Sequence, residues 1–93
     1  MAAKPAETEV TRYRVRPFNW DDEYIRVITT VNCAACEAVH KFGATGEEGS
    51  VYFIEILEPE PCIRRVESMG EGVFSCKEVS RDDALKEIRE SMN

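Results

Sequence analysis

The segment SVYFIEILE, residues 50–58, constrains the fold of this 93-residue chain more than any other stretch. It is almost continuously apolar and rich in β-branched and aromatic side chains, which is typical of a buried strand. Pro59 and Pro61 follow it, and neither has a backbone N–H to donate to a strand ladder. We therefore expect residues 50–58 to form a central strand of a sheet.

Four other segments predict the neighbouring strands. Residues 8–18 alternate in polarity, with Tyr13 and Val15 on one side and three arginines on the other, as in a half-buried strand. Residues 23–31 are rich in β-branched side chains and follow a short polar turn, which favours an antiparallel hairpin with the first strand. The last two strands are expected at residues 62–68 and 73–79, joined by the turn MGEG.

Two helices are predicted between and after these strands. Residues 33–42 contain strong helix formers, with Asn32 as the expected N-cap and Gly43 where a left-handed residue would end the helix. The final segment, residues 80–93, begins with Ser80 in a pattern that resembles a capping box and carries an apolar stripe.

The order of these elements, ββαβββα, predicts an α+β fold in which a mixed or antiparallel sheet is packed by two helices. The length of the chain suits a single domain. We expect a disordered lead-in over residues 1–8, because it is rich in Ala, Pro, Glu and Thr, and one domain over residues 9–93.

The charge of the chain bears on its partners. The net charge is −6, and residues 19–60 hold nine acidic residues against two basic ones. Such a surface disfavours nucleic acid and suits a protein partner with a basic site. The chain has no apolar run near the ~20 residues of a membrane helix, and its first ten residues lack the apolar core of a secretory signal. We therefore expect a cytoplasmic protein that binds neither membrane nor nucleic acid.

The cysteines are the main candidates for chemistry. Cys33, Cys36 and His40 are spaced i, i+3, i+7, so a helix would present all three on one face. Cys62 and Cys76, on adjacent predicted strands, can supply a fourth ligand or replace the histidine. Zinc in structural sites takes four nitrogen or sulfur ligands, so these five residues predict a structural zinc site.

A redox role is the alternative function for Cys33 and Cys36. A helix start stabilises a thiolate, which would make Cys33 the nucleophile and Cys36 the resolving thiol. The segments YIRVITTVNCAACEAVHKF and EPCIRRVESMGEGVFSCKEVSRDDALKEI resemble the opening and closing units of the thioredoxin-like superfamily. This resemblance implies that Pro61 matches the cis-proline that faces the active cysteines.

Simpler interpretations stand beside these. Free cysteine is among the most buried residue types, so all four thiols can also be small core residues. Disulfide pairing is a third arrangement, since Cys62 and Cys76 flank a hairpin and can face each other across it, but stable disulfides are unexpected without a secretory signal. The acidic run 21–23 is more typical of a solvated loop than of a cation site. The ring of Trp20 either covers the edge of the core or is exposed where a partner can bind it.

The sequence contains no P-loop, no dinucleotide-binding fingerprint and no serine elbow, so we expect a protein without conventional catalytic machinery. Three functions remain open. The first is a small acidic interaction module with a thiol cluster that holds zinc. The second is a thiol–disulfide exchange protein. The third is a small regulator that occupies a basic site on a protein partner.

Overall fold

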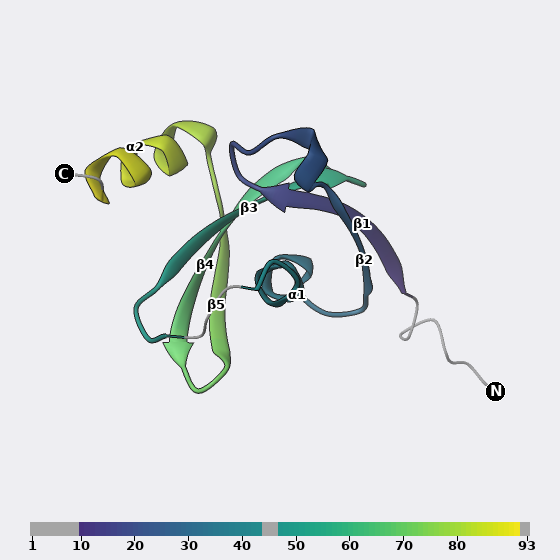
Figure 1. Cartoon of the computed structure of the whole chain (residues 1–93), viewed down its shortest axis with the longest axis horizontal. Helices are drawn as coiled ribbons and strands as arrows, with labels where there is room; N and C mark the ends of the chain where they lie inside the picture. The colour runs from purple at the N-terminus through teal and green to yellow at the C-terminus, as the bar shows by residue number, and fades with distance from the viewer. Residues whose placement is uncertain (1–9, 44–46, 92–93) are drawn as a thin grey trace.

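The computed structural model describes residues 10–43 and 47–91, and within them the chain forms an antiparallel sheet with two α-helices (Figure 1). The expected lead-in at residues 1–8 lies outside the described residues. The strands are β1 (Thr11–Pro17), β2 (Arg26–Thr30), β3 (Val51–Glu58), β4 (Cys62–Gly70) and β5 (Val73–Val79). The helices are the 3-10 turn η2 (Asp22–Tyr24), α1 (Ala34–Lys41) and α2 (Arg81–Ser91).

The strand order is β2-β1-β3-β4-β5, and each neighbouring pair is antiparallel. This order confirms the predicted α+β class and the central position of β3. Because no described pair is parallel, α1 is not a crossover helix between parallel strands. The cis peptide bond of the described chain precedes Pro59, and not Pro61 as the thioredoxin-like resemblance implied.

Alternate residues of β3 point to opposite faces of the sheet, and each face packs in a hydrophobic core. Ile54 and Ile56 belong to a core with the apolar side chains of α1, while Phe53 packs with α2 in a second core. Figure 1 shows α1 beneath the crossing of the strands and α2 at the other side of the sheet. The buried alanines of α1 allow close approach to the sheet; these are Ala34, Ala35 and Ala38.

Several element boundaries differ from those predicted, and the local structure explains two of them. The N-cap of α1 is Cys33 and not Asn32, because the Asn32 N–H is bound by Thr30 Oγ1 at 2.9 Å in the turn that precedes the helix. The second strand begins at Arg26, since residues 22–24 close a 3-10 turn in which the Ile25 N–H bonds to the Asp22 carbonyl. The N-cap of α1 therefore lies one residue later than predicted, and β2 begins three residues later than predicted.

Candidate metal centre

Three cysteines converge where the start of α1 meets β5. The sulfur atoms of Cys33, Cys36 and Cys76 all lie within 4.8 Å of one another, and each side chain is half-buried. Among the described residues, no other group of three metal-binding side chains lies this close together. All four cysteines of the chain are free thiols.

Local structure explains how α1 supplies two of these sulfurs. Cys33 is the N-cap, with extended backbone angles of φ −69° and ψ 113°, and its Sγ accepts the Cys36 N–H at 3.4 Å. The spacing of three residues places Cys36 one turn along the same helix face. A CxxC pair at a helix start therefore directs both sulfurs to the same side.

The third sulfur comes from the alternation of β5. Phe74 and Cys76 are half-buried against the core under α1, whereas Ser75 and Lys77 are exposed, as the sequence pattern predicted. Cys76 lies opposite Val66, which is fully buried at the middle of β4. This register brings Cys76 next to the start of α1.

The three thiols differ in acidity. Burial opposes ionisation of Cys33, but hydrogen bonds from the Cys36 thiol and N–H, the Cys76 thiol and the Ala35 N–H together lower its pKa below the usual value. Burial, together with the neighbouring Cys33 thiolate, raises the pKa of Cys36 to about 12 and that of Cys76 to about 11. Of the three thiols, Cys33 therefore ionises most readily, because its pKa is lowered while those of Cys36 and Cys76 are raised.

The structure leaves the other two candidate ligands outside this group. Cys62 pairs with Ile56 and lies four residues along β4 from the position opposite Cys76, which corresponds to about 13 Å of strand. It cannot face Cys76 across the hairpin. His40 lies one turn beyond Cys36, but its ring packs edge to face on Phe74, with 5.0 Å between ring centroids.

The geometry suits a soft metal ion. Zinc binds thiolates at about 2.3 Å, so two sulfurs on a tetrahedral ion stand about 3.8 Å apart. The three sulfurs here need to approach only slightly to meet that spacing. The remaining position needs a fourth donor, and His40 is the nearest nitrogen ligand along α1.

The other candidate residues lie elsewhere. In the acidic run, Asp22 forms an ion pair with Arg16, and all three acidic side chains are exposed. Trp20 is 55% exposed and packs edge to face on Tyr24, with centroids 4.9 Å apart.

Sequence reasoning missed the capping role of Cys33, for which the CxxC at a strand-to-helix junction was the available signal.

Comparison with known proteins gives no relative: no family model, curated protein or solved structure matches this chain. Within the described residues, no helix combines the length and apolar character needed to cross a membrane.

Proposed function

We propose that the protein is a small acidic interaction module whose helix α1 is fastened to β5 by a zinc ion bound to Cys33, Cys36 and Cys76. The observation that supports this proposal is the convergence of three sulfurs, from two separate elements, within 4.8 Å. Two of them come from a helix start, where backbone N–H groups and the helix dipole favour thiolates. A reducing compartment such as the cytoplasm keeps such thiols available for a metal.

The ion would have a structural role. Helix α1 has only eight residues, too few to be stable without tertiary support. The cluster is placed at its first turn, where it would join the helix to the last strand of the sheet. His40 would complete the tetrahedron by turning away from Phe74, or a ligand from outside the chain would take that position.

The proposal is tested by metal stoichiometry and by stability. Native mass spectrometry of protein purified under reducing conditions should show one zinc per chain, and cobalt substitution should give the absorption of a tetrahedral thiolate site. At free zinc 100 times the dissociation constant, binding adds about 2.7 kcal/mol, which raises the melting temperature of a domain this size by roughly 10–20 °C. A chelator should reverse that increase.

Two matched variants locate the site. Cys76→Ser should lose the bound zinc and the effect of the chelator, whereas Cys62→Ser makes the same chemical change outside the cluster and should keep both. Equal zinc content in the two variants, or a melting temperature that zinc and chelator leave unchanged, would contradict the proposal.

Thiol–disulfide exchange is the second candidate, favoured by the lowered pKa of Cys33 beside the Cys36 thiol. In this reaction the Cys33 thiolate attacks a disulfide of another protein and releases one thiolate. In the mixed disulfide that results, the Cys36 thiolate, after losing its proton to solvent, attacks the Cys33 sulfur and displaces the second thiolate of the substrate, which leaves a Cys33–Cys36 disulfide and a reduced substrate. A dithiol reductant would restore the pair. Loss of two daltons per chain in the presence of an oxidised peptide, with no bound metal, is the result that would favour this function.

A further inference from the structure

The first two residues of β3 have an edge that β1 does not cover. Pairing of β1 with β3 ends at Pro17 opposite Ile54, and a last hydrogen bond runs from the Phe18 N–H to the Phe53 carbonyl at 2.9 Å. The chain then turns away toward η2. On its other side, β3 stays paired with β4 back to Val51 opposite Glu67.

Val51 directs its backbone groups toward this open side. Successive residues of a strand present their N–H and C=O groups to alternate neighbours. Since the Phe53 carbonyl faces β1, the N–H and C=O of Val51 face the same way, beyond the point where β1 ends. No described residue pairs with Val51 there. An unpaired strand edge of this kind is a template for an added strand.

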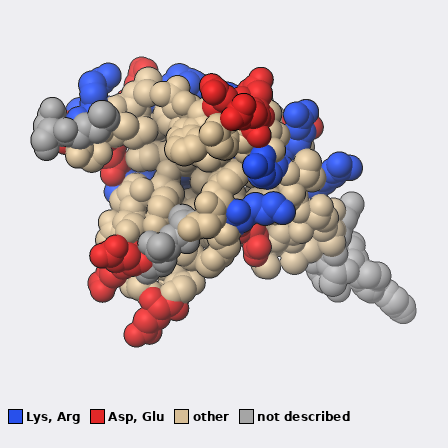
Figure 2. Space-filling model, in the orientation of Figure 1, with Lys and Arg blue, Asp and Glu red and all other residues tan. Residues whose placement is uncertain are grey.

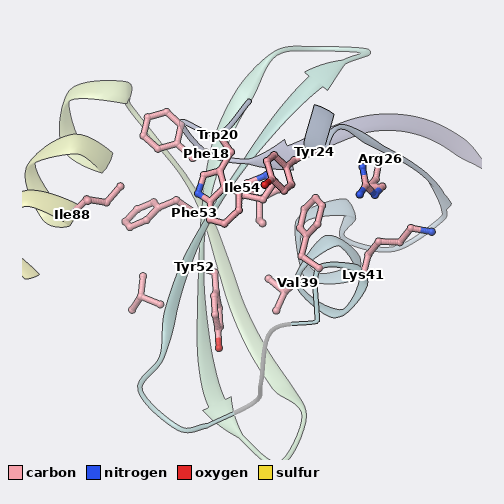
Figure 3. Close-up of a pocket in the computed structure, with 13 residues that line it drawn as sticks. Phe18, Trp20, Tyr24, Arg26, Val39, Lys41, Tyr52, Phe53, Ile54 and Ile88 are labelled. Atoms are coloured by element: carbon pink, nitrogen blue, oxygen red, sulfur yellow. The ribbon is translucent and has the colours of Figure 1, made fainter. Parts of the chain in front are cut away.

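A groove of about 540 Å³ surrounds this edge. Figure 3 shows that its walls come from both sides of β3: Phe18, Phe53 and Ile88 on the side of α2, and Val39 and Tyr24 on the side of α1. Side chains of an extended peptide point alternately to opposite faces. A peptide paired with Val51 would therefore place successive side chains in the two halves of the groove.

The charge of the groove is opposite to that of the chain. Arg26 and Lys41 line it, and no Asp or Glu does, although the chain has 18 acidic residues. The Arg26 guanidinium is held in place by the carbonyls of Glu23 and Ile25, at 3.0 and 2.9 Å. In Figure 2 the uncharged centre of this face has basic side chains to its right, beside α1 and the start of β2, and acidic side chains above it. An acidic group suits that end of the groove.

Trp20 adds a contact residue at the rim. It lines the groove while more than half of its side chain is exposed. Trp and Arg are the residue types that most often dominate binding energy at interfaces. An exposed Trp beside an aromatic groove is therefore placed to cover a bound chain.

We propose that this groove binds an extended segment of a partner protein as an added strand on β3, with alternating apolar side chains and an acidic residue at the end next to Arg26 and Lys41. This inference rests on the proposed role in binding and is independent of the metal. Main-chain hydrogen bonds to Val51 would supply affinity, and the two half-grooves would select side chains.

The test uses short capped peptides and the full chain labelled with ¹⁵N. The first peptide alternates valine and phenylalanine after two glutamates, the second has the acidic pair at the other end, and the third carries lysines instead. An acidic peptide should shift the amide resonances of Val51 and Phe53 and bind about fivefold more tightly than the lysine peptide. Methylation of its backbone nitrogens should abolish binding.

Protein variants locate the contact. Trp20→Ala should weaken the acidic peptide by about tenfold, and Lys41→Glu should remove its preference over the lysine peptide. Lys86→Glu, the same change at an exposed site of α2 outside the groove, should change neither.

Equal binding of acidic and basic peptides, tolerance of backbone methylation, or no shift at Val51 with any peptide would overturn the inference. Self-association that removes the free edge would identify a second copy as the occupant and would also overturn it. Each titration is repeated with zinc and with chelator, so that failure of the groove and failure of the metal site are distinguished.

Discussion

Cys33 combines two roles at one atom. Its sulfur accepts the Cys36 N–H and so caps α1, and the same sulfur belongs to the three-cysteine cluster. Serine is a strong N-cap, whereas alanine provides no acceptor. The two roles can therefore be separated by substitution.

In metal-free protein, Cys33→Ala should be about 1 kcal/mol less stable than Cys33→Ser, which corresponds to a melting temperature about 4–8 °C lower. The serine variant keeps a capping oxygen, but it should lose zinc as completely as the alanine variant. Thermal unfolding by circular dichroism in chelator, with metal content measured in parallel, checks both statements. Identical stability of the two variants would show that the sulfur does not act as a cap.

At this scale the sequence identified the candidate ligands but could not choose among them. Cys62 and Cys76 both lie on strands beside α1, and only the register, with Cys76 opposite Val66, decides which one reaches the cluster. The ring contact of His40 with Phe74 likewise depends on how α1 lies against β5. Neither relation is local in sequence.

Among the elements, α2 is attached to the sheet by a small set of contacts. Ala84 is fully buried, and Arg65 of β4 holds Glu87 by two hydrogen bonds of 2.8 and 2.7 Å. The Ser80 hydroxyl accepts the Asp83 N–H at 3.1 Å, which confirms the predicted N-terminal cap. That cap was predictable because it is local, whereas the cap of α1 depended on the turn before it.

The ion pair makes the attachment of α2 sensitive to acid. Hydrogen bonds from Arg65 hold the pKa of Glu87 below its ordinary value of 4.5. A carboxylate with a lowered folded-state pKa contributes stability that is present above 4.5 and is lost as pH falls through the lower value. Glu87→Gln should cost less than about 1 kcal/mol at neutral pH, because the pair is partly exposed.

Below pH 4.5 the difference between Glu87→Gln and the parent protein should shrink, as measured by urea unfolding across an acid series. Glu90→Gln, at an exposed site of the same helix, is the control and should follow the parent throughout. A difference that stays constant down to the lowest pH would contradict this role for Glu87.

At the scale of the whole molecule, the main feature is that the central strands β3 and β4 both contribute side chains to each of the two hydrophobic cores. The α+β class and the position of β3 followed from the apolar run at residues 50–58, since such a strand needs neighbours on both sides. The groove did not follow from sequence, because it depends on where β1 stops pairing relative to Ile54. Strand ends of this kind are set by tertiary packing.

This arrangement predicts an order of local stability. Amides of β4 and of residues 54–56 in β3, where strands lie paired on both sides, should exchange with solvent most slowly and approach the free energy of global unfolding. Those of β2, at the edge of the sheet, and of α2 should exchange faster. Hydrogen exchange of the intact chain measures this order directly, and equal protection of β2 and β4 would contradict it.

The third sulfur of the cluster, Cys76, belongs to the final strand, whereas the first two neighbour each other at the opening of α1. A growing polypeptide exposes the CxxC pair long before its third partner is synthesised. A bound ion would therefore be fully coordinated only after β5 has docked, and its retention would report that this strand has folded onto the sheet beside α1.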